Sequence, residues 1–375
     1  MARVWVPPNG TIHRLVHQYA GAASGLILLG FLWAGLSPFD PTPENDVSWI
    51  EGGPGLRFRR GSVLGPPAPD PDTSGPCSIE VWAAPASNRR SSRIVEFYDA
   101  GTRGGFQIGQ VGDTALSLAQ SDRSGVEVVW VRHAFARGER VLITVASDGT
   151  GTNVYLDGVL ARTTPRVRAS GRDCGSAFVL GTGSTSDVLW NGDLLGLAIY
   201  DRALSPREAG AHHEAWRSGG GPVGDSGETA DRAPAALYLF DERSGDVVRD
   251  RSGGERHLAV PPSFLAPLPR FLERPSWTRI EAYGMDWPDI VVNVGGFAPF
   301  GFWVAAFLVS MRRRPREVVA LTLSGALLVS LTIEVLQFWL PTRTSSLTDV
   351  VTNVLGAASG LALYRLLLEH PADPV

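Results

Sequence analysis

Four long apolar stretches constrain the fold of this 375-residue chain more than any other feature of its sequence. They cover residues 15–39, 290–311, 318–340 and 350–368. A helix needs about 20 mostly apolar residues to cross the hydrocarbon layer of a membrane, and each stretch meets that requirement. The first stretch is longer than the apolar part of a signal peptide, and the Ser-Pro-Phe at its end is a poor cleavage site. We therefore predict an α-helical membrane bundle with four uncleaved spans.

The arginines predict how these spans are oriented. Arg3 and Arg14 precede the first span, and four more arginines lie between the second and third spans, within residues 312–316. Only Arg343 lies between the third and fourth spans. Because positively charged short loops stay on the cytoplasmic side, we expect both termini inside and residues 40–285 outside.

The long segment between the first two spans has the alternating pattern of β-strands. Asp148-Gly149 and Asp157-Gly158 are dipeptides typical of hairpin turns. Ser205 and Glu208 have the spacing of a capping box, which predicts one helical turn there. Many short strands without helices between them predict an all-β domain, an antiparallel two-sheet jelly-roll sandwich inserted between spans one and two. The runs richest in β-branched and aromatic residues are 78–83, 93–97, 141–145 and 153–158.

Two passages of this segment carry a family resemblance. VLITVASDGTGTNVYLDGVL at residues 141–160 and WNGDLLGLAIYDRALSPRE at residues 190–208 resemble the laminin-G/concanavalin-A-like jelly-roll family. LYLFDERSGDVVRDRSGGERHL at residues 237–258 resembles the strand that normally opens such domains, yet here it comes last. The resemblance therefore implies a circularly permuted sandwich, which a fold with adjacent ends tolerates. It also implies a domain that binds glycans or proteins by its exposed loops.

Hydrolysis and cofactor binding are not expected of this domain. A glycosidase needs two carboxylates facing one sugar, and the E-x-D-x-x-E string that places them on one strand is absent. Glu96 and Asp99 have an odd spacing, which points their side chains to opposite faces of a strand. Calcium on the jelly roll would need an acidic cluster that the sequence does not provide. Cys77 and Cys174 each precede a predicted strand, and either a disulfide or two buried thiols fits them.

The membrane region contains a repeated pattern that includes acids. D-[IV]-V-x-N-V-x-G opens both the second and the fourth span, at the same expected depth, and Glu334 lies on the antiparallel third span. Because an ionisable group inside a span is costly, these residues predict a polar pocket in the outer leaflet. Helix capping by the aspartates and interhelical bonding by the asparagines are the alternative, but Glu334 lies too far inside its span to cap that helix. The pocket candidates are Asp289, Asn293, Glu334, Gln337, Arg343, Asp349 and Asn353.

The same residues carry a second resemblance. D-x-x-x-N-x-x-x-F-x-P-F-G from residue 289, E-x-x-Q from residue 334, PTRTSSLTD at residues 341–349 and N-x-x-G-x-x-x-G from residue 353 resemble the VanZ-like family. The resemblance implies a bacterial plasma-membrane protein of the cell envelope, with a link to antibiotic resistance through glycopeptide tolerance. A large β domain replaces the short loop usual in that family. The glycines expected to pack helices closely are Gly296, Gly301, Gly356 and Gly360.

The sequence thus predicts three parts and two functions. Residues 1–40 form a cytoplasmic N-terminus and span one, residues 41–275 an extracytoplasmic sandwich, and residues 276–375 a VanZ-like region with spans two to four. The first function is to present a jelly roll that binds an envelope glycan, a lipid headgroup or a surface protein. The alternative is a membrane enzyme or carrier for a lipid-linked envelope precursor, with the acids as general base or cation ligands.

Several chemistries have no support in the sequence. No residue is assigned a catalytic role, since no nucleophile elbow or phosphate-binding loop occurs. No metal site is expected, because His212 and His213 are adjacent and cannot share one helix face. The net charge of -4 argues against a nucleic-acid partner.

Overall fold

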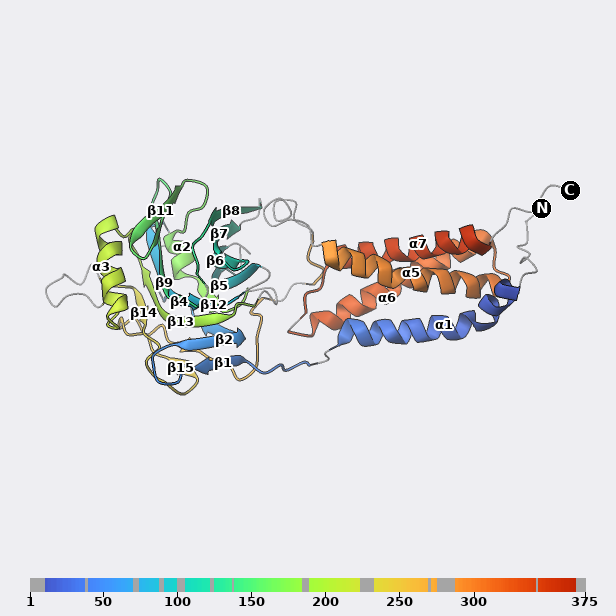
Figure 1. The fold of residues 1–375 in the computed structure, drawn as a ribbon, viewed down its shortest axis with the longest axis horizontal. Helices are drawn as coiled ribbons and strands as arrows, with labels where there is room; N and C mark the ends of the chain where they lie inside the picture. The colour runs from blue at the N-terminus through green and yellow to red at the C-terminus, as the bar shows by residue number, and fades with distance from the viewer. Residues whose placement is uncertain are drawn as a thin grey trace. The chain divides into compact units, whose positions relative to one another are not determined.

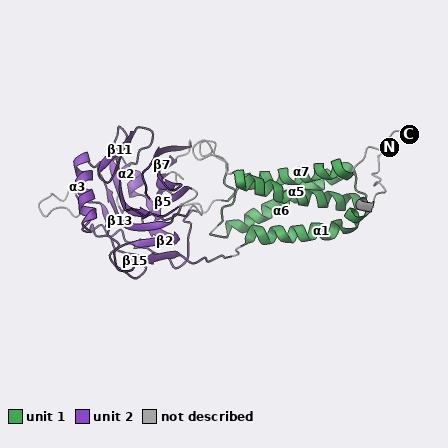
Figure 2. Ribbon diagram, viewed as in Figure 1, with its two compact units in different colours: residues 1–41, 270–275, 284–375 green, residues 42–269, 276–283 purple. Residues whose placement is uncertain are grey.

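The computed structural model describes residues 11–37, 40–69, 74–87, 91–99, 105–121, 125–136, 138–183, 189–222, 233–268, 271–274, 287–341 and 343–368. The chain divides into two compact units (Figure 2). The helical unit comprises Met1–Pro41, Arg270–Pro275 and Gly284–Val375, and the sandwich comprises Thr42–Pro269 and Ser276–Tyr283.

Four helices form the helical unit: α1 (Thr11–Leu36), α5 (Trp287–Ser310), α6 (Pro315–Phe338) and α7 (Leu347–Leu368) (Figure 1). All four are long and apolar enough to cross a membrane, as the sequence predicts. Helix α5 packs most extensively on α7. The four helices therefore form one bundle. The sandwich is inserted in the sequence between its first helix, α1, and its second helix, α5.

Glycines set the distance between α5 and α7. A Cβ atom added to Gly360 would overlap the carbonyl oxygen of Ala298, and one added to Gly301 would overlap the carbonyl oxygen of Ala357. Gly356 similarly faces the α5 backbone at Val294. The two backbones therefore touch, which no larger residue would allow. The fourth predicted packing glycine, Gly296, faces α1 instead.

Gly296 faces α1 because its nearest neighbour is an aromatic side chain of that helix. A Cβ atom added there would lie 4.0 Å from Cε1 of Phe31 in α1. Phe31 itself stacks on Phe297 of α5, with ring centroids 4.4 Å apart. At Gly296, the contact between α1 and α5 is thus made by aromatic side chains.

The sandwich consists of two eight-stranded antiparallel sheets within the described residues (Figure 1). The first sheet has the order β1-β2-β13-β4-β9-β10-β11, with β14 also paired to β13, and the second has the order β15-β16-β3-β12-β5-β6-β7-β8. The strands are β1 Asp46–Trp49, β2 Leu56–Arg60, β3 Val63–Gly65, β4 Cys77–Pro85, β5 Ser91–Tyr98, β6 Gly105–Val111, β7 Ala115–Ser121, β8 Val126–Val131, β9 Val141–Ser147, β10 Thr152–Leu156, β11 Val159–Thr164, β12 Ala177–Leu180, β13 Gly192–Tyr200, β14 Ala236–Tyr238, β15 Val247–Val248 and β16 Leu258–Ala259.

The predicted strands and turns are present. The run 141–145 lies in β9, and residues 153–156 of the run 153–158 lie in β10; the two strands are joined through the turn at Asp148-Gly149. Asp157 and Gly158 both have positive φ, at 50° and 77°, which is the conformation of a hairpin turn between β10 and β11. Apolar side chains on the inner faces of both sheets form one core that excludes water.

The last segment of the sandwich pairs with both sheets. β14 pairs with β13 through Leu197 and Tyr238, and β16 joins the second sheet through Ala259 and Leu64. The predicted pairing of residues 237–258 is therefore confirmed. The ends of the domain are adjacent, because the amide of Phe264 donates to the carbonyl of Pro43 at 2.8 Å. Adjacent ends are what a circular permutation requires.

A buried arginine fastens this segment. Arg256 is 4 % exposed, and its guanidinium donates to the carbonyl oxygens of Pro66, Cys174 and Ser176. Cys174 lies in the short helix α2 (Gly171–Gly175) and forms a disulfide with Cys77 at the start of β4. The disulfide links two cysteines that are 97 positions apart in the sequence. Together, the disulfide and the arginine tie α2 to both halves of the sandwich.

One helix, α3 (Pro206–Arg217), covers the outer face of the first sheet. The predicted capping box is present, since the Ser205 hydroxyl accepts from the Glu208 amide and the Glu208 carboxylate accepts from the Ser205 amide. The helix is longer than the predicted single turn, with 12 residues. Its length comes from tertiary packing, because Trp216 at its far end is buried against the sheet.

Candidate functional site

Glu334 is the most buried of the acids predicted in the membrane region. Its side chain is on α6 and is 1 % exposed. The carboxylate Oε2 accepts a hydrogen bond from the backbone amide of Ser346 at 2.7 Å, immediately before α7 begins. The Ser346 hydroxyl in turn accepts from the amide of Thr348 at 3.1 Å. Glu334 thus satisfies a donor at the start of the neighbouring helix, where no water is available inside a bilayer.

The polar contacts continue deeper between α6 and α7. Asp349 lies close enough for its charge to act on Glu334. Asn353, one turn further along α7, donates through Nδ2 to the Ser330 hydroxyl at 3.0 Å. Its Oδ1 is buried and accepts no hydrogen bond from the described residues. Glu334, Asp349, Asn353 and Ser330 therefore form one cluster, which we call the α6–α7 cluster.

The other predicted pocket residues make contacts of their own outside this cluster. Asn293 donates to the Thr352 hydroxyl at 3.3 Å and so joins α5 to α7. Asp289 is exposed in the first turn of α5, where its negative charge interacts favourably with the positive end of the helix dipole. Gln337 donates to the carbonyl of Gly35 at 2.7 Å.

Arg343, like Gln337, donates to a backbone carbonyl at the C-terminal end of α1. Its guanidinium donates to the carbonyl of Ser37. Since the last carbonyls of a helix have no partner within it, Gln337 and Arg343 supply donors for the C-terminal end of α1. A short chain segment lies beside them, where the amide of Glu273 donates to the carbonyl of Ser345 at 2.8 Å. Ser345 is 1 % exposed.

We expect Glu334→Leu to destabilise the helical unit by about 1–3 kcal/mol, because the buried amide of Ser346 loses its acceptor. Glu334→Gln should remain near wild-type stability, since an amide oxygen can accept the same bond. Thermal unfolding of the full chain in detergent measures both, with Val335→Leu on the lipid-exposed face as the matched control. A leucine variant as stable as wild type would exclude this structural role.

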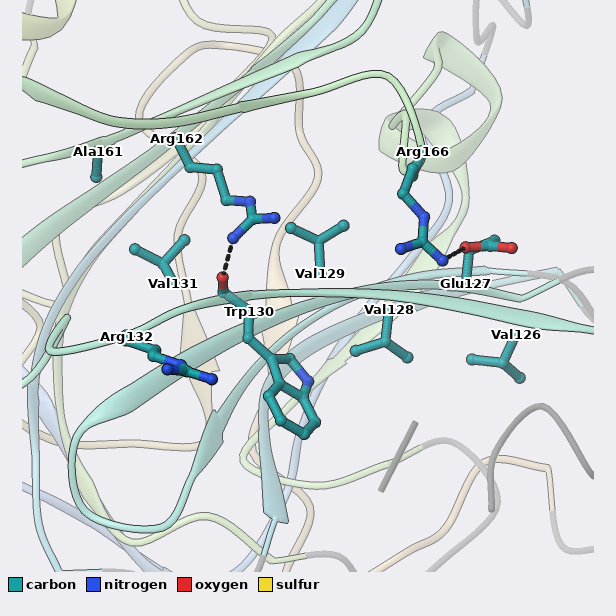
Figure 3. A pocket seen from close by; sticks show the side chains of 10 residues that line it. All are labelled: Val126, Glu127, Val128, Val129, Trp130, Val131, Arg132, Ala161, Arg162 and Arg166. Carbon is teal, nitrogen blue, oxygen red and sulfur yellow. Dashed lines mark hydrogen bonds and ion pairs between the residues drawn. The ribbon is translucent and has the colours of Figure 1, made fainter. Parts of the chain in front are cut away.

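The sandwich has an open groove between the last strands of its two sheets, β8 and β11 (Figure 3). Its volume is about 680 Å³, within the range of small-ligand sites. The Arg162 guanidinium crosses the groove and donates to the carbonyl of Trp130 at 2.8 Å. The Trp130 side chain is 37 % exposed. The lining residues that carry chemistry are Glu127, Trp130, Arg132, Arg162 and Arg166.

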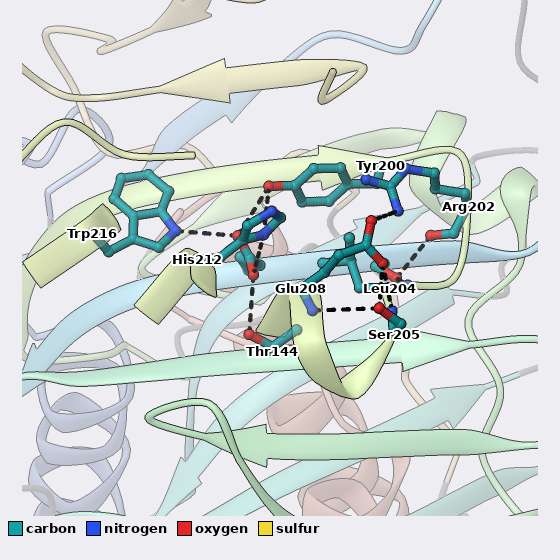
Figure 4. Close-up of polar contacts among 10 residues, drawn as sticks. Thr144, Tyr200, Arg202, Leu204, Ser205, Glu208, His212 and Trp216 are labelled. Atoms are coloured by element: carbon teal, nitrogen blue, oxygen red, sulfur yellow. Dashed lines mark hydrogen bonds and ion pairs between the residues drawn. The ribbon is translucent and has the colours of Figure 1, made fainter. Parts of the chain in front are cut away.

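A second polar cluster lies between α3 and the first sheet (Figure 4). Glu80 of β4 is 0 % exposed. Its carboxylate accepts from the Tyr200 hydroxyl at 3.0 Å and from the Trp216 indole at 3.1 Å. Thr144 donates at 3.2 Å, and Nδ1 of His212 lies 3.0 Å away. We call these five residues the Glu80 network.

The Glu80 network is a structural feature. Burial, and then the Glu80 charge, raise the pKa of the Tyr200 hydroxyl, so tyrosine stays a donor at neutral pH. When Glu80 is ionised it can only accept, so His212 must carry a proton on Nδ1 in this contact. Since the carboxylate is fully enclosed, it joins α3 to the sheet and cannot reach a substrate. The adjacent His213 points elsewhere, toward Asp157 at 3.7 Å.

Sequence reasoning missed both features of the sandwich. Glu80 stands between Ile79 and Val81 in a run that predicts a strand, so an acid between apolar neighbours was the available signal. Trp130 lies in β8 and Arg132 directly follows that strand, and the strand's pattern alone does not show on which side it lacks a neighbouring strand. Their position at a sheet edge depends on the order of all the strands.

The chain thus has four helices that are long and apolar enough to cross a membrane, with an antiparallel two-sheet jelly roll inserted after the first. Residues 238–368 match the VanZ/LLP1 family model, and residues 61–210 match the model of the concanavalin A-like lectin/glucanases superfamily. The chain thus combines a VanZ-like membrane region with a concanavalin-A-like domain. None of the curated proteins matches it.

Solved structures similar to the chain include three of different kinds. The botulinum neurotoxin type G receptor binding domain is 13% identical with a TM-score of 0.34, and the match covers 46% of this chain and 45% of that one. A SAP-like pentraxin from Limulus polyphemus is 15% identical with a TM-score of 0.34, covering 59% and 95%. A putative carbohydrate binding protein from Bacteroides ovatus is 12% identical with a TM-score of 0.39, covering 57% and 61%. The chain spans about half the length of the first of these.

Proposed function

We propose that this protein is a glycan receptor of the bacterial cell envelope, held in the plasma membrane by its VanZ-like helices. The observation that supports this most is the groove between β8 and β11, where an exposed tryptophan lies beside arginines. Ligand sites combine aromatic surface with a few polar groups that fix orientation, and this groove has both. The match to a superfamily described as lectins and glucanases agrees with a glycan as the ligand.

Binding rather than hydrolysis is proposed because the groove lacks a suitable acid pair. Glu127 is the only carboxylate among the described residues of its lining, and it pairs with Arg166 at 2.9 Å. A glycosidase requires two carboxylates across one sugar. The domain would therefore hold a glycan at the membrane surface without cleaving it.

Trp130→Ala should weaken glycan binding at least about tenfold, because a sugar ring loses its aromatic packing surface. The measurement is binding of the full chain in nanodiscs to a panel of peptidoglycan fragments, oligogalacturonate, mannan and dextran. Val247→Ala is the control, since Val247 is 43 % exposed on β15, at the opposite end of the same sheet. If no member of the panel binds the wild-type protein, the proposed function is wrong.

The proposed orientation places the sandwich outside the cell and both termini in the cytoplasm. Arg207→Cys on α3 should react with a membrane-impermeant maleimide in intact cells, whereas Arg313→Cys between α5 and α6 should not. Both positions are exposed, and the native cysteines form a disulfide, so the background is low. The reverse labelling pattern would place the sandwich in the cytoplasm.

The α6–α7 cluster supports a second candidate function, a carrier or enzyme for a lipid-linked envelope precursor. The specific observation is the buried Oδ1 of Asn353, which accepts no hydrogen bond from the described residues beside two acids. A buried acceptor of this kind is costly unless a ligand or water donates to it. Glu334→Gln, which keeps the bond to Ser346, should then abolish glycopeptide tolerance in cells, whereas a receptor function alone would leave it unchanged.

A further inference from the structure

The groove between β8 and β11 differs in charge from the chain that contains it. The chain as a whole carries a net charge of -4, yet three arginines and one glutamate line this groove. Three positive charges and one negative charge leave a formal charge of two positive units there. Because Arg166 and Glu127 already pair with each other, the uncompensated charge belongs to Arg132 and Arg162. An anion entering the groove would meet both.

Arg132 is the cation best placed to meet a ligand. Its side chain is exposed, and within the described ranges no hydrogen bond or ion pair holds it. It follows Trp130 by two positions and lies one residue beyond the end of β8. Figure 3 shows the indole ring and the guanidinium on the same side of β8. An aromatic surface thus lies next to a planar, permanently charged donor.

This pair of side chains matches a sugar ring that carries an acidic group. The C–H face of a pyranose packs on an indole, as other apolar surfaces do. A guanidinium binds a carboxylate or phosphate through two parallel N–H donors, a geometry that a neutral sugar cannot use. Neutral glycans would leave the arginine charge without a partner and would therefore bind less tightly.

The edge of β8 also argues against a peptide strand as the ligand. β7 pairs with β8 along one edge, and the Arg162 guanidinium bonds to the Trp130 carbonyl across the groove. A strand added to that edge would have to displace the guanidinium from the carbonyl. Arginines on edge strands also discourage pairing between chains. The groove therefore favours a ligand that binds through side chains.

Building on the proposed glycan-binding function, we propose that the groove between β8 and β11 is a binding site for acidic glycans. Trp130 packs against a sugar ring, and Arg132 and Arg162 pair with its carboxylate or phosphate group. The specificity would thus come from charge, because the neutral part of the sugar contacts only the aromatic surface.

Two matched pairs of probes test this proposal on the full chain in nanodiscs. The first pair is oligogalacturonate and its methyl ester, and the second is a phosphomannan and its dephosphorylated form. We expect at least one acidic member to bind about tenfold or more tightly than its neutral partner, and the pair that does so identifies the acidic group. Added salt should weaken the acidic member selectively, because it screens exposed charges.

Two arginine variants complete the test. Arg132→Gln should weaken binding of the acidic probe about tenfold, the loss expected for one charge-assisted contact. Arg207→Gln on α3 makes the same change of charge at an exposed position outside the groove and should have no effect. If the arginines serve only to block strand pairing, Arg132→Gln will leave probe affinity unchanged, and the proposal is overturned.

The outcomes also separate this proposal from the proposed function. Equal affinity for the acidic and neutral members of both pairs, lost in Trp130→Ala, would overturn the preference for acidic glycans and retain a glycan receptor. Binding of only the neutral members of the wider panel would likewise overturn the preference for acidic glycans and retain a glycan receptor. No binding to any glycan would overturn both.

Discussion

Glu80→Leu should lower the free energy of unfolding of the sandwich by at least about 3 kcal/mol. The carboxylate accepts from three neutral donors and contacts His212, and these groups belong to the first sheet and to α3. Leucine leaves the buried donors of Thr144, Tyr200 and Trp216 without their carboxylate acceptor, and each such loss costs about 1–3 kcal/mol. The stability of Glu80→Gln should lie between those of Glu80→Leu and the wild type. Its amide keeps one acceptor oxygen but replaces the other with an NH2 donor, which faces the donors of the neighbouring side chains.

The measurement is urea unfolding of the full chain in detergent, followed by tryptophan fluorescence. Glu214→Leu is the control, since Glu214 lies on α3, the helix that Glu80 joins to the sheet, and pairs with Arg217 at 3.0 Å. Both side chains of that pair are more than half exposed, so its loss should cost under about 1 kcal/mol. If the Glu80→Leu and Glu214→Leu variants unfold at the same urea concentration, the Glu80 network does not hold α3 in place.

Gly360→Ala should destabilise the helical unit by about 2–3 kcal/mol, the cost of overpacking a close contact. The added methyl group would overlap the carbonyl oxygen of Ala298 and press on the amide of Phe302. Both neighbours are backbone atoms, so no side chain can rotate away. The α5 and α7 helices must therefore move apart, which weakens the most extensive helix contact of the unit.

Gly295→Ala is the control for Gly360→Ala because it makes the same chemical change with no neighbour within 4 Å. Alanine favours a helix over glycine by about 1 kcal/mol, so this variant should be as stable as wild type or slightly more stable. Thermal unfolding of the full chain in detergent compares the two. Equal effects of the two substitutions would show that α5 and α7 do not pack through Gly360.

Much of the helical unit is predictable because its signals are local. Helix length and hydropathy depend only on neighbouring residues, and these predict α1, α5, α6 and α7. The small residues at 356 and 360 predict close packing, and a Cβ at either position would meet the α5 backbone. The role of Glu334 was not predictable, since its acceptor contact is with the first residues of another helix.

The sandwich is predictable to the level of its strands and turns. The two-residue alternation, the turn at Asp157-Gly158 and the capping box at Ser205 are each set within a few residues. The resemblance of residues 237–258 to an opening strand predicted a pairing that β14 and β16 make. The disulfide between Cys77 and Cys174 remained one of two alternatives, because the sequence does not bring two distant residues together.

The sequence by itself determined the kind of each part: long apolar helices where apolar runs are long, and strands where the pattern alternates. Only the tertiary structure decided which side chains meet. The Arg162 guanidinium reaches the carbonyl of Trp130 because β8 and β11 end their sheets, and Glu80 has partners on β9, β13 and α3. Periodicity acts over a few residues, whereas these contacts depend on the order of all the strands.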